Sequence, residues 1–149
     1  MKILKSRLRE IQAKYKTVKD VNNACIHSSK DVANYFRRIF PVELDDRESM
    51  VVLYLNNSNT TVGYSIAGIG GITSTVVDVR LILRDGLLTG STSMIICHNH
   101  PSGSLKPSQA DLNLTKKVKT AAKVMDITLL DSLILTEDSY YSFADEGKL

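Results

Sequence analysis

A series of short apolar runs, separated by turn residues, constrains the fold of this chain most strongly. MVVLYLN at 50–56 and TTVGYSIAG at 60–68 flank a turn made of Asn and Ser. This arrangement predicts a hairpin of two antiparallel strands. SMIIC at 93–97 has the composition of an interior strand. Two later runs, ITLLDSLIL at 127–135 and YYSF at 140–143, are predicted to form the last strands.

Helical patterns alternate with these runs. Asp31 is predicted to cap the N-terminus of a helix that ends just before Pro41, because a residue preceding proline is disfavoured in the helical conformation. Asp78 is predicted to cap a second helix, which Gly86 weakens. Residues 108–125 carry apolar side chains at helical spacing, with lysines on the exposed side. The predicted fold class is therefore α/β or α+β, a layered domain with a mixed central sheet of five or more strands flanked by helices.

A cluster of glycines, Gly68, Gly70 and Gly71 in AGIGGI, follows the predicted hairpin. A phosphate-binding loop would need a following Lys-Ser/Thr or a third spaced glycine, and neither is present. We therefore favour a bend in the sheet, followed by a short strand over 73–77.

The composition is that of an ordinary globular domain. The chain has 149 residues, of which 43% are hydrophobic and 23% charged. At this length about two thirds of the extended chain's surface can be buried, so neither a disulfide nor a metal is needed for stability alone. Cys25 and Cys97 form no CxxC pair, and no apolar run is long enough for a membrane span or a signal peptide. We expect a cytoplasmic protein with no membrane contact.

The charge is concentrated at the amino terminus. Residues 1–19 hold seven Lys and Arg against one Glu. We predict a basic helical arm over 1–27 and a compact domain over 28–149. The arm is interpreted either as a weak contact with DNA or another polyanion, or as a solvated amphipathic helix. The second interpretation is favoured, because no aromatic residue lies among the charges before Tyr15. The apolar stripe of that helix would consist of Ile3, Leu4, Leu8 and Ile11.

The segment HNHPSGSLKPSQAD at 98–111 carries the candidate chemistry. Because strand side chains alternate, His98 and His100 project to one side, while Cys97 and Asn99 project to the other. A proline then stops the strand, and the following loop can bring Asp111, in the first turn of the next helix, to the same point. Two nitrogens and one carboxylate oxygen leave a fourth tetrahedral position for water, as in a catalytic zinc site.

These residues also admit three other interpretations. Ser108 and Asp111 form an S-x-x-D capping box that could serve only the helix start. A Ser-His-Asp triad with Ser108 as nucleophile is disfavoured, because the sharp G-x-S-x-G turn is absent. The letters His-Asn-His also occur in the name of the HNH nucleases, but in those enzymes the three residues are dispersed over a longer unit.

The complete pattern H-x-H-x7-S-x2-D resembles the JAMM (MPN) metallohydrolase motif, and the chain meets it at His98, His100, Ser108 and Asp111. HNHPSG, PSQAD, the run Leu-Leu-Asp at 129–131 and the closing Tyr-Ser-Phe are similar to the bacterial RadC family of JAMM proteins. The resemblance covers about residues 28–149. It implies the MPN/JAMM architecture, which is cytidine-deaminase-like.

The resemblance also implies a function. One Zn²⁺ per chain would be held by His98, His100 and Asp111, with Ser108 donating a hydrogen bond at the site. Glu48 matches the position of the family's general base, and Glu43 is the nearby alternative. The implied activity is hydrolysis of a peptide or isopeptide bond in a protein or peptide substrate.

Two departures from the family weaken any inference of DNA binding or full equivalence. The residues before the match are too few for the helix-hairpin-helix region that RadC proteins usually carry. Asp131-Ser132 stands where many members have Asp-His. The rival hypotheses are a non-catalytic, DNA-repair-associated binding protein and, third, a metal-dependent nuclease, for which Lys106 is the only cation in the loop. The sequence does not indicate the oligomeric state.

Deleting residues 1–19 tests the arm. If the arm contacts DNA, binding should weaken with salt by a slope of about −0.7 to −0.9 per phosphate contact, and the deletion should abolish it. Metal content should be unchanged, because the candidate ligands lie far downstream. Fluorescence anisotropy with labelled DNA over a salt series measures the salt slope and the loss of binding on deletion. Tight binding that survives the deletion would instead favour the nuclease hypothesis.

Overall fold

The computed structural model describes residues 12, 14–16, 18–19, 21–70 and 76–149. The apolar stripe of the predicted N-terminal helix lies outside these residues, and so does most of the short strand expected over 73–77. Within the described part, no helix is both long and apolar enough to cross a membrane.

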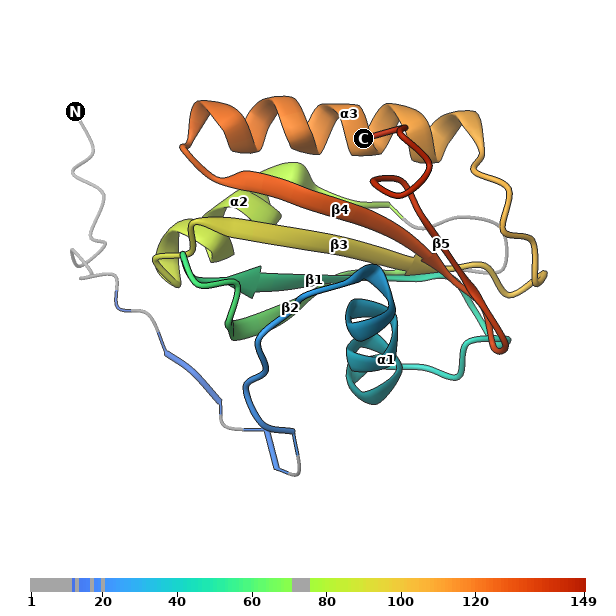
Figure 1. Ribbon diagram of the computed structural model, residues 1–149, viewed down its shortest axis with the longest axis horizontal. Helices are drawn as coiled ribbons and strands as arrows, with labels where there is room; N and C mark the ends of the chain where they lie inside the picture. The colour runs from blue at the N-terminus through green and yellow to red at the C-terminus, as the bar shows by residue number, and fades with distance from the viewer. Residues whose placement is uncertain (1–11, 13, 17, 20, 71–75) are drawn as a thin grey trace, which may run out of the picture.

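Five strands form one mixed sheet in the order β2-β1-β3-β4-β5 (Figure 1). β1 pairs antiparallel with β2 and β3, β4 pairs antiparallel with β5, and β3 and β4 are parallel. The predicted hairpin and the predicted mixed sheet are both confirmed. The strands are β1 Ser49–Leu55, β2 Thr61–Ile69, β3 Ser93–Asn99, β4 Thr128–Leu135 and β5 Tyr140–Ser142.

Helices cover both faces of the sheet, which gives a layered α/β domain as predicted (Figure 1). The central strand β1 is buried throughout, and its side chains alternate between two apolar cores. Val51, Leu53 and Leu55 pack on the side of α1. Val52 and Tyr54 pack on the side of α2 and α3. The helices are α1 Ser29–Ile39, α2 Val79–Leu88 and α3 Gln109–Val124.

The predicted cap of α1 was wrong. Ser28, not Asp31, is the N-cap, and its hydroxyl oxygen accepts a hydrogen bond from the Asp31 backbone N–H. Asp31 lies in the first turn, where its carboxylate accepts from the His27 N–H at 3.3 Å. Both residue types cap helices, and the earlier one prevails because its backbone is extended. The predicted end is confirmed, since Phe40 is the C-cap.

The other two caps agree with the prediction. The Asp78 side chain accepts from the Arg80 N–H at the start of α2, and Ser108 caps α3. The described part of the glycine cluster belongs to β2 and its exit. The register between β1 and β2 shifts so that Val51 pairs with Ile66 and Met50 with Gly68, which is a β-bulge. This irregularity agrees with the bend that the sequence favours.

Gly86 explains how closely α2 approaches the sheet. A Cβ atom at Gly86 would lie 3.1 Å from Ile127 Cδ1 and 3.4 Å from Tyr54 Cε1. Tyr54 also donates a hydrogen bond from its hydroxyl to the Ile82 carbonyl of α2 at 2.9 Å. The glycine that weakens the helix in isolation is therefore the point of contact between helix and sheet.

Gly86→Leu is expected to lower the free energy of unfolding by about 1–3 kcal/mol, because the larger side chain overpacks this contact. Urea denaturation followed by circular dichroism measures the loss. Gly63→Leu is the matched control, since a Cβ at Gly63 has no atom within 4 Å. Equal losses in the two variants would show that Gly86 is not a packing constraint.

Candidate metal centre

Three elements meet at one edge of the sheet. β3 carries His98 near its end, and His100 follows directly after the strand. Met50 of β1 pairs with His98 across the antiparallel ladder. Glu48, which directly precedes β1, therefore lies beside the histidines. The loop after His100 leads into α3, whose first turn holds Asp111. The β3–α3 connection therefore places the first turn of α3 beside the end of β3.

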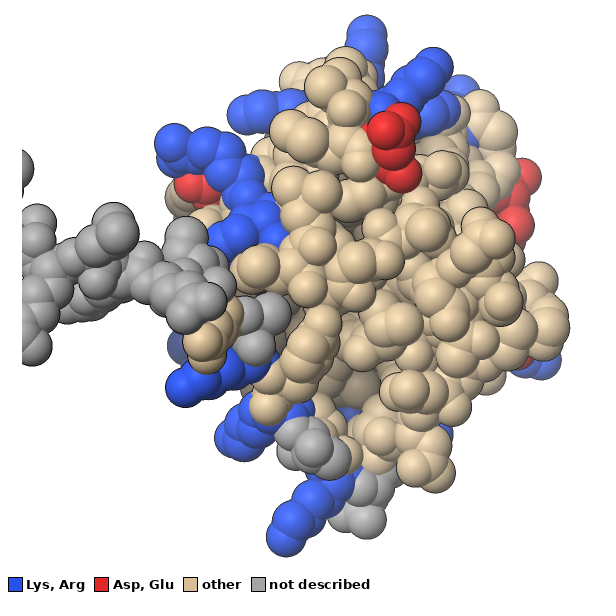
Figure 2. Space-filling view, turned by 90° about the vertical axis from the view of Figure 1, so that its left-hand side faces the viewer, with Lys and Arg blue, Asp and Glu red and all other residues tan. Residues whose placement is uncertain are grey.

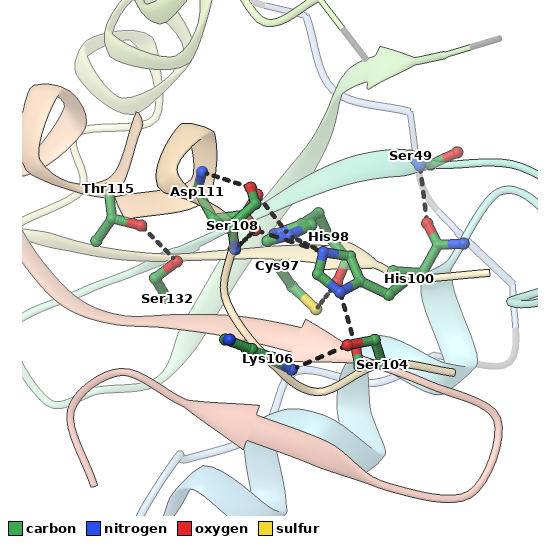
Figure 3. A network of polar contacts seen from close by, with 11 residues as sticks. Ser49, Cys97, His98, His100, Ser104, Lys106, Ser108, Asp111, Thr115 and Ser132 are labelled. Carbon is green, nitrogen blue, oxygen red and sulfur yellow. Dashed lines mark hydrogen bonds and ion pairs between the residues drawn. The ribbon is translucent and has the colours of Figure 1, made fainter. Parts of the chain in front are cut away.

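The functional atoms of His98, His100 and Asp111 lie close together (Figure 3). The Nε2 atoms of His98 and His100 are 3.0 Å apart. His98 Nε2 is 3.1 Å from Asp111 Oδ1, and His100 Nε2 is 3.5 Å from Asp111 Oδ2. Together with a carboxylate oxygen of Glu48, these potential ligand atoms all lie within 4.8 Å of one another. The structure thus brings together four of the five residues singled out in the sequence around one point.

These distances fit a small divalent ion. Nitrogen and oxygen ligands that surround zinc tetrahedrally at its usual bond lengths lie about 3.3–3.5 Å apart. The observed separations of 3.0–3.5 Å for His98, His100 and Asp111 are close to that range. The donor set of two imidazoles and a carboxylate is also one that zinc commonly takes. The residues present therefore fit a bound metal ion.

A backbone carbonyl orients His100. Its Nδ1 lies 2.7 Å from the Ser104 carbonyl oxygen, which can only accept, so the Nδ1–H donates there and Nε2 is the ring atom that faces the cluster. The hydrogen bond with Asp111 raises the pKa of His100 above its usual range. His98 is 4% exposed, and its Nδ1 is buried without a hydrogen-bond partner among the described residues.

Asp111 serves the helix and the centre at once. The Ser108 backbone N–H donates to Asp111 Oδ2 at 2.6 Å, while the Asp111 N–H donates to the Ser108 hydroxyl at 3.2 Å. Burial acts to raise the pKa of Asp111, but hydrogen bonds from His100 and His98 outweigh it and hold the pKa well below its usual range. The capping box and the metal-ligand interpretation are therefore compatible.

The histidine contacts do not form a Ser-His-Asp triad. The ring nitrogens of His98 and His100 contact each other, Asp111 and the Ser104 carbonyl. The Ser108 hydroxyl accepts from the Asp111 N–H instead of contacting a histidine nitrogen. Cys97, beside His98, is fully buried, and burial raises the pKa of its thiol well above the usual range. It is therefore a packed thiol rather than a thiolate ligand.

The centre opens into a cleft of ≈ 450 Å³. Both apolar and polar side chains line this cleft. Among the described residues that line it, Lys106 is the one Lys or Arg. A larger groove of ≈ 690 Å³ lies elsewhere, lined by residues 14–16, 18, 21 and 23 together with parts of β2 and α2, and its lining contains none of the clustered residues. The cleft residues beyond the cluster are Met50, Val77, Pro101, Ser102, Ser104, Lys106, Ser108, Ala110 and Leu114.

Two contributors to the centre carried little or no sequence signal. The Ser104 carbonyl is a backbone group and has no side-chain signature. Asn99 projects away from the cleft as predicted, but its side chain contacts the segment that carries Glu48. A polar residue that continues an apolar strand was the available clue.

A mixed sheet between two layers of helices, with His-x-His at the end of a strand and Asp in the next helix, defines a JAB (JAMM/MPN) domain. The family model described as the RadC-like JAB domain matches residues 26–148. The chain therefore belongs to the RadC-like JAB-domain family, as the sequence motifs implied. The division into an arm at 1–27 and a domain at 28–149 remains a prediction.

Curated relatives support this assignment. A UPF0758 protein of Flavobacterium johnsoniae is 52% identical over 122 residues, which is 82% of this chain and 52% of that protein. A Porphyromonas gingivalis UPF0758 protein is 40% identical over 116 residues, covering 76% of this chain and 51% of that protein. A UPF0758 protein of Clostridium acetobutylicum is 34% identical over 142 residues, which is 95% of this chain and 61% of that protein. The chain thus spans about half the length of the first of these relatives.

Affinity for a divalent ion, probed with zinc, is expected to fall at acidic pH. The pKa of metal-free His100 lies above the ordinary 6.5, so its proton is held to higher pH and the ion must displace it. Below that raised pKa, apparent affinity should fall about tenfold per pH unit for this one proton. Competition with a chromophoric chelator over a pH series measures it.

His27→Ala provides the control, because His27 is the chain's third histidine and is not part of the cluster. It should leave affinity unchanged, whereas His100→Ala should abolish it. Zinc affinity that does not vary with pH, or equal losses in the two variants, would contradict the assignment.

Proposed function

We propose that this JAB domain is a zinc-dependent hydrolase that cleaves a peptide or isopeptide bond. The observation that carries the proposal is the convergence of two imidazole nitrogens and the Asp111 carboxylate at metal-ligand distances. A second carboxylate, that of Glu48, lies beside them in the cleft. Three protein ligands leave one coordination position open, as in catalytic rather than structural zinc sites.

His98, His100 and Asp111 would hold one Zn²⁺ per chain. When bound, the ion would supply Lewis acidity that polarises a carbonyl group and makes water more acidic. The chain's own part is to fix the ligand atoms. The Ser104 carbonyl sets the tautomer of His100, and the capping box sets the carboxylate of Asp111. Both act before any substrate is present.

Glu48 would be the general base. Its carboxylate accepts a proton from the attacking water and delivers it to the leaving amine. Its position directly before β1, within reach of the three ligands, supports this role. Such proton transfer by a positioned carboxylate contributes about 10²–10⁴-fold to the rate.

Ser108 would stabilise the negative charge that develops on the substrate oxygen. Its hydroxyl oxygen accepts from the Asp111 N–H, which leaves the hydroxyl proton to be donated toward the cleft that Ser108 lines. Removing one such donor in comparable sites costs about 3 kcal/mol of transition-state stabilisation.

The lining of the cleft favours an uncharged chain over a phosphodiester. Met50, Val77 and Leu114 provide an apolar wall, and Lys106 is the one Lys or Arg among its described lining residues. Nucleic-acid substrates are usually met by several cations, because phosphate contacts dominate their affinity. A peptide or isopeptide backbone, which is neutral, suits this lining better. A binding role in DNA repair depends on the basic arm, not on this cleft.

Hydrolysis can be tested directly. Protein loaded with one equivalent of zinc is incubated with a quenched fluorescent peptide library and with a peptide branched through a lysine ε-amide. Cleavage of either probe, abolished by a chelator and by His98→Ala, is the expected result. Cleavage of labelled DNA instead of both probes would reverse the proposal.

Glu48→Gln is expected to retain zinc and to lose hydrolysis by about 10²–10⁴-fold, because glutamine cannot accept the proton. Elemental analysis and the peptide assay measure the two effects separately. Glu43→Gln is the matched control, an acid in the same connector, and should keep both properties. Loss of zinc in Glu48→Gln would make Glu48 a ligand, and loss of activity only in Glu43→Gln would move the base to Glu43.

A further inference from the structure

The residue between the two histidine ligands contacts the other side of the centre. Asn99 is 0% exposed and points away from the cleft, into the layer beneath the connector that precedes β1. Its Oδ1 accepts from the Ser49 N–H at 2.7 Å. Its Nδ2 donates to the carbonyl oxygens of Leu44 and Arg47, each at 2.9 Å. Asn99 thus bonds to the backbone on both sides of Glu48.

The connector needs such an anchor, because it contains no helix or strand. Residues 40–48 form turns and bends, with one local bond from the Asp46 N–H to the Glu43 carbonyl at 3.2 Å. The Glu48 carbonyl accepts from the Gly70 N–H at 2.8 Å, which holds the connector to the end of β2. The bonds of Asn99 hold it to β3. Glu48 is therefore fixed between two strands by backbone bonds on either side of its side chain.

We propose that Asn99 is the positioning residue that sets the Glu48 carboxylate relative to the metal ligands. This inference rests on the proposed function of Glu48 as the base. Residues 98–100 place two ligands on one face of the strand and the anchor of the base on the other. Any movement of the strand therefore moves ligands and base together. A base misplaced by about 1 Å can cost about 10²-fold in rate, so this coupling matters.

Asparagine suits this position because the surrounding backbone offers one donor and two acceptors. Its side-chain amide presents one acceptor oxygen and two N–H donors, and all three partners are met here. Aspartate would place a carboxylate oxygen, which cannot donate, against the carbonyl oxygens of Leu44 and Arg47. An apolar residue of the same size would leave the buried Ser49 N–H unpaired, at a cost of about 1–3 kcal/mol, and would also lose the two part-buried carbonyl partners.

Asn99→Ala tests the proposal, with Asn56→Ala as the matched control. Asn56 also uses Oδ1 to hold backbone, accepting from the N–H groups of Ser58 and Thr60, but in the β1–β2 turn at the opposite end of β1. Both variants lose side-chain bonds to backbone, and only one is beside Glu48. Asn99→Ser, which keeps a polar atom but is too short to bridge, replaces Asn99→Ala if that variant does not fold.

Three readouts are compared in zinc-loaded protein. By NMR hydrogen exchange, the Ser49 amide should exchange about tenfold faster or more in Asn99→Ala, corresponding to one lost bond, while amides of β4 stay protected. The ¹³C resonance of the Glu48 carboxyl, assigned with Glu48→Gln, should shift. For the lysine-branched peptide probe, kcat should fall about 10–100-fold with KM and zinc affinity nearly unchanged. Asn56→Ala should change none of the three.

The outcomes separate this inference from the proposed function. If wild-type protein cleaves no probe, the proposed function fails, but a shifted Glu48 resonance and an exposed Ser49 amide in Asn99→Ala would still support positioning. If both signals match wild type, or if β4 and Ser49 lose protection together, Asn99 is not a positioning residue. Loss of zinc as complete as in His98→Ala would also overturn the inference.

Discussion

Antiparallel pairing of β1 with β3 is the constraint on which the centre depends. With Met50 opposite His98, the start of β1 and the end of β3 lie at the same edge of the sheet. β3 then pairs in parallel with β4, and a parallel pair requires a crossover, which α3 provides. The crossover begins where β3 ends, so the first turn of α3 is beside the histidines. Glu48, the two imidazoles and Asp111 converge because of the topology, before any side-chain contact is considered.

The start of α3 shows how one residue can satisfy a local rule and a site at once. A helix needs acceptors for its first N–H groups, and a buried carboxylate needs donors. Asp111 meets both needs, since Oδ2 accepts from the Ser108 N–H while Oδ1 faces His98 Nε2. The hydrogen bonds that complete the helix therefore also fix the rotation of the carboxylate. A candidate ligand held by its own helix cap would need less reorganisation to bind an ion.

Features that depend on neighbouring residues could be predicted from the sequence, and those that depend on distant ones could not. Alternation in β3 predicted that His98 and His100 share a face. Capping residues predicted two of three helix starts, and Pro41 predicted the end of α1. The sequence does not separate Ser28 from Asp31 as the cap of α1, because serine and aspartate are both capping residues and the backbone conformation decides between them. Glu48 was matched through the family, since nothing in its neighbourhood indicates a partner about fifty positions away. The contacts of Gly86 with Ile127 and of Asn99 with Leu44 required the folded chain.

The Asp131-Ser132 pair of β4 divides into two separate roles. Asp131 accepts from the Ser142 hydroxyl, the Ala144 N–H at 2.9 Å and the Ser132 N–H at 2.7 Å, and it holds β5 and the following turn to β4. Burial raises the pKa of this carboxyl despite these donors. The Ser132 hydroxyl instead accepts from Thr115 Oγ1 of α3 at 3.0 Å, one helical turn beyond Asp111. The serine thus forms a neutral pair of hydroxyl groups with α3, separate from the contacts of His98, His100 and Asp111.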